Sequence, residues 1–401
     1  MSIGVTTVIL FAVFALLLFA SCPISVSIVI SSIVAAISSL SWDQITFITM
    51  QKMNSGVESF SLLAIPLFIL AGNIMNNGGI ARRLVNFAKI FVGWIPGSLA
   101  QANIVGNMLF GALSGSSVAA ASAMGGCIYP IEKDEGYDPA FATAVNIASA
   151  PTGLLIPPTS AFIVYSTVAG GVSISTLFMA GYIPGILMGL GSMVVAFIYA
   201  KKHKYPVSGR MPASEALKVT LEAFPSLLLI VIVIGGIVGG IFTATEGAGG
   251  IILFLISASS AMSFVMAYSG IPAAISTAIM SVSENPYVIF LLMNVILLIV
   301  GMFMDITPAI LIFTPIFLPI AESLGMSNIQ FGVMLIFNMC LGNITPPVGS
   351  VLFVGCGISK ISIEEVTKTL LPYFGVLILI LLAVTYIPAL SLGVPAMMGL
   401  L

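Results

Sequence analysis

The chain has 401 residues, of which 59% are hydrophobic and only 6% are charged, and its formal net charge is −2. A water-soluble protein of this size needs far more charge on its surface, so the composition excludes that class. Apolar stretches of roughly 18 or more residues recur along the whole length, which is the pattern of membrane-spanning helices.

The cysteines and the histidine carry no sign of catalysis or metal binding. The four cysteines lie in or beside apolar segments without the spacing of a ligand set, and we interpret them as reduced packing residues. They are Cys22, Cys127, Cys340 and Cys356. The single histidine, His203, lies in a basic loop and is predicted to be solvated.

The first half begins with two predicted spans, Ile3–Ala20 and Pro23–Leu40. The first span has no basic residue before its apolar run, so we interpret it as a membrane helix and not as a secretory signal. Two amphipathic stretches, Ser41–Phe60 and Ala81–Phe91, are predicted to lie along the membrane interface.

A re-entrant hairpin is predicted next. The runs Ile95–Leu113 and Val118–Ile131 are too short, or too rich in small residues, for full spans, and they flank the polar tip Ser114–Ser117. Backbone that leaves the helix at such a depth is tolerated only where protein or water surrounds it. A charged loop, Glu132–Asp138, is predicted to follow the hairpin.

The stretch Asn146–Tyr165 is long enough to cross a bilayer, but prolines and a glycine interrupt its middle. It recurs at Leu335–Val354, and one shift of 189 superposes matching residues of both stretches without a gap over more than forty positions. The matches include Pro157 on Pro346, Pro158 on Pro347, Gly153 on Gly342, Pro130 on Pro319, Ser173 on Ser362 and Ile174 on Ile363. The sequence therefore predicts a duplicated protein with one broken helix per half, as in secondary transporters.

The remaining elements follow the same plan. Gly181–Ala200 is a span, and the polar stretch Lys201–Lys218 joins the two halves. The second half is predicted to contain spans at Phe224–Phe242, Ile251–Tyr268 and Leu370–Tyr386, an interfacial segment at Ser269–Glu284, and a hairpin formed by Pro286–Met304 and Ala309–Ile320 around a tip at Asp305–Pro308.

The predicted fold class is an all-α polytopic membrane protein built as an inverted repeat, with two re-entrant hairpins and two broken helices. We divide it into scaffold and interfacial helices, a first transport part, a middle scaffold with the linker, a second transport part and a last span. These parts are residues 1–94, 95–180, 181–285, 286–369 and 370–401.

The basic residues set the predicted orientation. If the joining loop is cytoplasmic, eleven of the twelve basic residues lie inside and only Lys52 does not. The hairpins then enter from opposite sides. A return crossing is missing after Phe242, so we predict that roughly 25 residues are absent near Gly247–Gly250, since a span needs about 20. A natural loss, the alternative, would break the topology of the repeat.

Each hairpin tip is predicted to face a helix break and to hold a sodium ion. Sodium is a hard cation that prefers oxygen ligands, and unwound backbone offers free carbonyl groups. The first candidate set is Ser114, Gly115, Ser116, Ser117, Ser149, Pro151 and Gly153. The second is Asp305, Thr307, Asn338, Gly342, Asn343 and Thr345. The structural alternatives are close helix packing at the Ser/Gly tip and an N-cap role for Asp305.

The substrate is predicted to be a carboxylate, because the half-helices direct the positive ends of their dipoles toward the membrane midplane. No arginine lies there to pair with an anion. Thr159, Ser160 and Ser350 are the candidate substrate contacts, and packing is an equally good interpretation of them. No transition-metal site is predicted.

Several motifs together resemble the large membrane (M) subunit of tripartite ATP-independent periplasmic (TRAP) transporters. They are LLAIPLFILAGNIM at 62–75, GALSGSSVAAASAMG at 111–125, GIFTATEGA at 240–248, GMFMDITPAILIFTPIFLPIA at 301–321 and GNITPPVG at 342–349. The resemblance implies a sodium-driven, elevator-type importer of organic acids in the bacterial inner membrane. It also implies a small four-helix membrane subunit and a periplasmic substrate-binding protein as partners. Sialic acid is favoured as the substrate, and a C4-dicarboxylate comes next.

Other classes of protein fit less well. A stand-alone sodium/anion symporter or antiporter of related fold is the alternative, and independence from a binding protein would distinguish it. An intramembrane enzyme is disfavoured because no Ser/His, Asp/Asp or metal-ligand set is present, and no Walker motif indicates the use of ATP. An open channel is disfavoured because two offset hairpins suit alternating access better.

Overall fold

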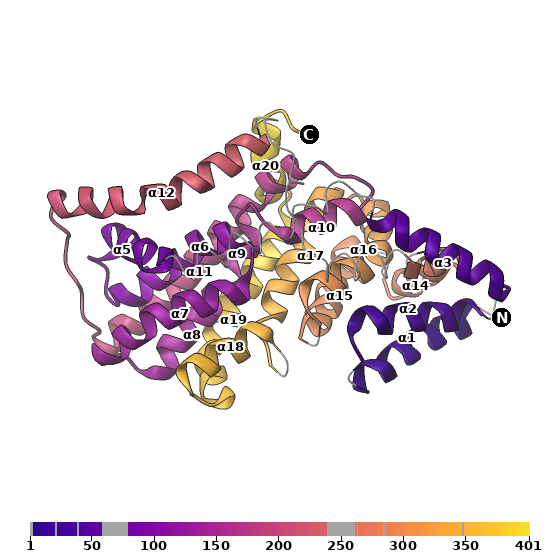
Figure 1. Cartoon of the computed structure of the whole chain (residues 1–401), viewed down its shortest axis with the longest axis horizontal. Helices are drawn as coiled ribbons and strands as arrows, with labels where there is room; N and C mark the ends of the chain where they lie inside the picture. The colour runs from indigo at the N-terminus through magenta and orange to yellow at the C-terminus, as the bar shows by residue number, and fades with distance from the viewer. Residues whose placement is uncertain are drawn as a thin grey trace.

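The structure is a computed structural model of the chain. It describes residues 3–20, 22–37, 40–57, 79–238, 261–262, 264–283, 285–302, 304–346 and 349–401, and within these residues every regular element is a helix (Figure 1). The prediction of an all-α protein is confirmed.

The N-terminal part contains three helices, and the first two are shorter than the spans predicted for them. They are α1 (Ile3–Phe19), α2 (Ile24–Ala36) and α3 (Trp42–Val57). Helices α1 and α2 pack side by side, and together with α3 they lie at one end of the molecule (Figure 1). At 17 and 13 residues, α1 and α2 fall below the roughly 20 residues of a typical span.

The amphipathic segment Ala81–Phe91 forms α5 (Ile80–Val92). Its apolar face is buried against α6, while Arg82 and Arg83 are exposed. In the second half, α14 (Ile271–Met280) occupies the predicted interfacial segment.

Both hairpins form as pairs of packed helices. The first consists of α6 (Ser98–Ser114) and α7 (Ser117–Asp134), and the second of α15 (Pro286–Gly301) and α16 (Ile306–Ser323). A positive φ at Gly115 lets the chain reverse direction at the tip of the first hairpin. The Ser116 hydroxyl accepts a hydrogen bond from the Ala119 N–H and so caps α7. The predicted loop Glu132–Asp138 begins later than predicted, at Glu135, because α7 continues through Asp134.

Both predicted helix breaks are present. The first runs through α8 (Pro139–Ser149), α9 (Thr152–Leu155) and α10 (Ser160–Val168), with a bend of 47°. The second lies between α17 (Asn328–Gly342) and α18 (Ser350–Ser359). Proline and glycine account for both breaks, since proline removes a backbone donor and clashes with the preceding turn.

The matched residues of the repeat have matched roles. Ser173 and Ser362 are the N-caps of α11 (Ile174–His203) and α19 (Ile363–Tyr386), and each side chain accepts a backbone N–H of the first turn. Two of the predicted part boundaries, at residues 180 and 369, therefore fall inside helices. The boundaries at 94 and 285 fall between helices.

The two halves are interlocked. The second arm of each broken helix packs against the hairpin of the other half: α10 contacts α16, and α18 contacts α7. The Tyr129 hydroxyl donates to the Ser359 carbonyl across the α7–α18 contact at 3.2 Å. The thiol of Cys340 donates to the carbonyl of Pro151 at 3.5 Å. These two residues are equivalent under the shift of 189, so the two breaks meet at the pseudo-twofold axis.

The linker between the halves packs against the base of the first hairpin. The Ser98 and Ser208 hydroxyls lie 2.7 Å apart, and the Ser208 N–H donates to Ser98 Oγ. Helix α12 (Ala213–Val238) begins inside the stretch predicted as linker and extends along α5 (Figure 1). The motif at residues 62–75, the start of the predicted span at Ile251 and the predicted missing segment lie outside the described residues.

Within the described part of the chain, three helices are long and apolar enough to cross a membrane: α11, α16 and α19. The bent run from α8 to α10 is a fourth candidate. The last helix, α20 (Ala389–Met397), was not predicted; it packs against α11 and α17 near the C-terminus.

Tyr165, in the second half of α10, connects the two halves of the protein. Its side chain is fully buried, and its hydroxyl donates to the Asn328 carbonyl at the start of α17 at 2.5 Å. We expect Tyr165→Phe to lower the free energy of unfolding by about 1 kcal/mol, the net value of one such bond. Thermal unfolding of the purified protein checks this, and an unchanged melting temperature would contradict it.

Candidate functional site

The first helix break is held by an asparagine that projects from the hairpin. Asn107 Nδ2 on α6 lies 3.0 Å from Asn146 Oδ1 and 2.9 Å from Ser149 Oγ, both on α8. Asn146 Nδ2 in turn donates to the Ala121 carbonyl of α7. All three side chains are buried, so one polar network ties both hairpin arms to the helix just before it breaks.

The hairpin backbone touches the break directly through two glycines. A Cβ placed on Gly111 or on Gly153 would overlap the backbone of the other glycine. Only residues without a side chain allow this approach. Gly153 therefore contributes close backbone packing to the predicted site. Pro151, two residues before it, lies on the pseudo-twofold axis.

The tip of the first hairpin contacts a different part of the broken helix from the one we predicted. Gly115 lies against Pro158, Thr159 and Ser160, and the Ser160 hydroxyl is 3.5 Å from the Gly115 carbonyl oxygen. The expectation that Ser114–Ser117 faces Ser149–Gly153 needs correction. The stretch Ser149–Gly153 is instead packed by Asn107 and Gly111, further down α6, and the tip extends past that stretch to the double proline.

The second break has an equivalent network. Asn338 Nδ2 on α17 donates to Asn294 Oδ1 on α15 at 2.7 Å. Asn294 Nδ2 donates to the Thr385 hydroxyl oxygen on α19 at 3.1 Å. Gly342 packs on the backbone of Gly301, as Gly153 packs on Gly111. The two halves thus repeat both the amide bridge and the glycine contact.

Three of the described carbonyl groups at the second break accept hydrogen bonds, contrary to our prediction that the break leaves them free. The Asn343 carbonyl accepts the N–H groups of Val351 and Leu352 at the start of α18. The Gly342 carbonyl accepts the Thr345 N–H, and the Thr345 carbonyl accepts the Gly349 N–H. The chain satisfies these acceptors across the break, since an unpaired carbonyl in an apolar setting is costly.

Asp305 is the N-terminal cap residue of α16 and is exposed at the second tip. Its side chain makes no capping hydrogen bond, although its carbonyl accepts the Ala309 N–H. The predicted N-cap position is therefore present without the side-chain bond. Thr307 is half-buried, and the Thr345 hydroxyl donates to the Leu341 carbonyl at 2.6 Å.

The three predicted substrate contacts are not gathered into one group. The Thr159 hydroxyl oxygen caps α10 by accepting the Phe162 N–H, and its side chain is fully buried. Ser160 borders the first hairpin tip. Ser350 begins α18, and its buried hydroxyl oxygen has no hydrogen-bond partner.

Asn107 and Asn294 were missed by the sequence analysis. Each is an amide side chain in the first arm of a hairpin, within a run of apolar residues. A polar residue buried at membrane depth is a functional candidate by default, and that signal could have identified both. The hydrogen-bond partner of each asparagine could not be predicted, because it lies about 40 residues further along the chain in each half.

Two buried oxygen atoms beside the breaks fit a cation. Asn107 Oδ1 and Asn338 Oδ1 have no hydrogen-bond partner, and both side chains are almost fully buried. Most buried acceptors are paired, so such atoms call for an explanation. Amide oxygens are ligands that hard cations accept. The residues present at both breaks therefore fit a sodium ion.

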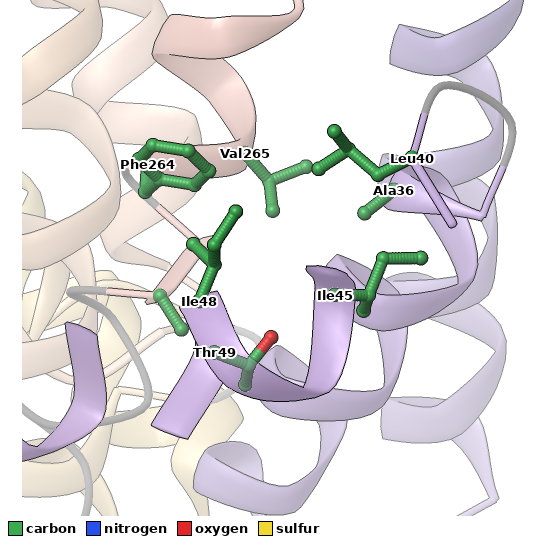
Figure 2. A pocket seen from close by; sticks show the side chains of 8 residues that line it. Ala36, Leu40, Ile45, Ile48, Thr49, Phe264 and Val265 are labelled. Carbon is green, nitrogen blue, oxygen red and sulfur yellow. The ribbon is translucent and has the colours of Figure 1, made fainter. Parts of the chain in front are cut away.

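Two pockets lie away from the breaks. One, of about 240 Å³, lies at the base of the second hairpin and is lined by Pro286, Tyr287, Phe290, Leu324, Gly325, Met326, Gln330, Thr385, Tyr386 and Pro388. The other lies between α2, α3 and the residues before α14, where Figure 2 shows Ile48 and Phe264 on one side and Ala36 and Leu40 on the other. Thr49 alone carries a polar side chain there, so we interpret the second pocket as packing within the scaffold.

A family model decides the identity of this arrangement. The model of the tripartite ATP-independent periplasmic transporter, DctM component, matches residues 11–253 and 248–390. The chain belongs to the DctM family. Members of the family are transporter permeases of the inner membrane, so this DctM protein is a large TRAP membrane subunit and not an enzyme.

Named relatives span nearly the whole DctM chain. It is 49% identical over 422 residues to the uncharacterized protein YgiK of Salmonella typhimurium, covering 97% of each chain. It is 36% identical to the C4-dicarboxylate TRAP large permease DctM of Pseudomonas aeruginosa, covering 87% of this chain and 89% of that one. It is 32% identical to the sialic acid permease SiaM of Vibrio cholerae, covering 94% and 96%.

A solved structure supports the fold of this DctM protein. The Alcanivorax borkumensis YdaH transporter, described as having an unusual topology, superposes with a TM-score of 0.54 over 90% of each chain. The sequence identity is 14%, so the likeness concerns the fold alone.

The alignments also bear on the middle of the chain. The YgiK alignment extends over 422 positions, which exceeds the 401 residues of this DctM protein, so YgiK has residues that this chain lacks. The two stretches matched by the family model overlap at residues 248–253, next to Gly247–Gly250. A missing segment there stays a prediction, because these residues lie outside the described part.

Proposed function

We propose that this chain is the large subunit of a sodium-coupled importer of small organic acids, working by an elevator-type motion of its hairpins and broken helices. The observation that carries the proposal is the meeting of the two breaks at Pro151 and Cys340, with an unpaired amide oxygen beside each break. Equivalent sites in two inverted halves suit a transporter that opens to each side in turn.

Sodium is proposed as the coupling ion. Asn107 Oδ1 in the first half and Asn338 Oδ1 in the second supply the neutral oxygen ligands, and Asp305 supplies a negative charge near the second tip. Two equivalent networks correspond to at least two sodium ions per transport cycle. The backbone carbonyl groups of the second break would become sodium ligands only after the hydrogen bonds that they accept across the break rearrange.

The proposed substrate is a carboxylate. Named relatives transport C4-dicarboxylates and sialic acid, and their identities to this chain are too similar to separate the two. Sialic acid, favoured by the motifs, stays a prediction. The three arginines of the chain are Arg82, Arg83 and Arg210, all outside the breaks and tips. Helix N-termini and hydroxyl groups such as Ser160 and Ser350 would contact the anion.

The proposed partners are those of the family: a small four-helix membrane subunit and a periplasmic substrate-binding protein. The N-terminal helices α1 and α2 carry exposed apolar residues, among them Val8 and Leu16, and a static scaffold of this kind offers a docking face. A stand-alone symporter remains the alternative, and dependence on the binding protein separates the two.

Uptake in proteoliposomes tests the proposal. We expect accumulation of a labelled C4-dicarboxylate or sialic acid only when the small subunit, the binding protein and an inward sodium gradient are all present. Uptake of free substrate by this chain alone would support the symporter. Uptake driven equally well by potassium would contradict sodium coupling.

Asn338→Ala tests the oxygen ligand within the same assay. We expect the sodium concentration for half-maximal uptake to rise by about 10-fold or more, since loss of even an outer partner costs a metal site 10–100-fold. Asn328→Ala, at the opposite end of α17, is the matched control and should leave the sodium dependence unchanged. Equal sodium dependence in both variants would remove Asn338 from the site.

A further inference from the structure

Glu132 is a buried carboxyl group that the transport mechanism does not use. It lies in the last turn of α7, at the base of the first hairpin and outside the candidate spans. Its side chain has no exposed surface, and neither carboxyl oxygen has a hydrogen-bond partner. A buried ionised carboxylate is costly unless it is paired, so its occurrence here needs a cause.

Polar groups from other parts of the chain act on it. Asn103 Nδ2 on α6 is directed toward Glu132, because Asn103 Oδ1 already accepts from Asn107 Nδ2 at 3.0 Å. The hydroxyl group of Tyr373 on α19 is buried and has no hydrogen-bond partner, and Tyr373 and Tyr137 both interact electrostatically with Glu132. Groups from three separate parts of the chain therefore act on one carboxyl group.

No positive charge balances it among the described residues. The titratable groups that interact with Glu132 are Glu135, Tyr129, Tyr137, Tyr205 and Tyr373. Arg82 and Lys89 on α5 act on Cys127 of α7 instead, Glu364 acts on Cys356 of α18, and Asp138 at the start of α8 accepts the Tyr199 hydroxyl. Helix α6 brings no titratable side chain, and neither does α9.

The surrounding groups suit a proton better than a metal ion. A hard cation such as sodium prefers oxygen ligands, whereas Asn103 presents its N–H₂ group to the carboxyl group. Burial, and to a smaller degree the negative charge of Glu135, raise the pKa of Glu132 from its ordinary value of 4.5 to about 8. The proton would therefore be held at neutral pH.

We propose that Glu132 is a proton-binding site that keeps the base of the first hairpin packed when its carboxyl group is protonated and loosens it when the group is ionised. The basic residues predict that this end of the hairpin faces the cytoplasm, so the proton would be exchanged with that side. The site lies at one end of a buried amide chain from Asn103 through Asn107 to Ser149 at the first break. Ionisation at the base thereby has a route to the break.

The direction of the pH effect follows from the two states of the protein. The folded protein holds a proton on Glu132 up to about pH 8, whereas the unfolded chain releases it near pH 4.5. The contribution of this group to stability is therefore greatest at low pH. It falls as the pH rises from about 4.5 and is fully lost above about 8.

Infrared spectroscopy and thermal unfolding of the purified full-length protein test the proposal without transport. We expect a protonated-carboxyl C=O band that disappears with a midpoint near pH 8, and a melting temperature that falls between pH 6 and 9. Glu132→Gln should remove the band and flatten the pH profile. Glu135→Gln, which removes an exposed carboxylate just after α7, is the matched control and should keep the band and the pH profile, with a midpoint slightly below that of the native protein.

Three outcomes would overturn the proposal. They are a band that persists in Glu132→Gln, a Glu132→Gln melting profile as steep as that of the native protein, and the absence of any protonated band at pH 6. If Glu132→Gln fails to fold, Glu132→Met supplies an uncharged variant of similar length. Sodium-driven uptake is a separate readout, so failure of the proposed transport function would leave these results unaffected.

Discussion

Replacing Asp305 by Ala is expected to lower sodium-driven uptake by at least about 100-fold, the upper end of what even an outer partner of a metal site contributes. Asp305 is exposed at the tip of the second hairpin, and its side chain is not used to cap α16. The carboxylate is therefore available to a cation. In a setting of low dielectric constant, a nearby negative charge offsets the charge of the ion.

Asp305→Asn separates the charge of the side chain from its size. Asparagine has nearly the same shape as aspartate and is a favourable N-cap residue, but it carries no charge. We expect uptake close to that of Asp305→Ala, with the protein still inserted and folded. Asp134→Asn, an exposed acid at the end of α7, is the matched control for a general loss of negative charge. If the sodium dependence of Asp305→Asn matches that of the unmodified protein, the carboxylate is only structural.

Gly342→Ala is expected to lower the free energy of unfolding by about 1–3 kcal/mol, the usual cost of adding atoms to a packed contact. A Cβ at this position would overlap the backbone of Gly301, and two helix backbones cannot yield as a flexible side chain can. The second break should separate from its hairpin, so uptake should fall together with stability.

Gly357→Ala provides the matched control. Gly357 lies in α18, and a Cβ there meets no other atom within 4 Å. Because Ala favours a helix over Gly by about 1 kcal/mol, we expect this variant to be slightly more stable than the native protein. Thermal unfolding of both variants in the same detergent decides the matter. Equal melting temperatures would show that the close glycine contact does not support the fold.

The features that depend on local chemistry could be predicted from the amino-acid sequence. The breaks at Pro157 and Pro346 follow from residues that cannot continue a helix, and the shared Ser173 and Ser362 caps mark equivalent helix starts. The polar tips could be identified because they interrupt apolar runs. The constant shift of 189 residues then revealed the duplication, and most of the architecture could be predicted from it.

The tertiary structure was needed to show which of these features are in contact. It shows that the first tip contacts Pro158–Ser160 and that the Asn343 carbonyl accepts hydrogen bonds from the first turn of α18. It also buried Glu132, which the sequence placed in a charged loop. Each of these outcomes depends on side chains brought together from distant helices. Periodicity and helix-breaking residues report the conformation of a segment, whereas the energy of a buried polar group depends on partners that the segment does not contain.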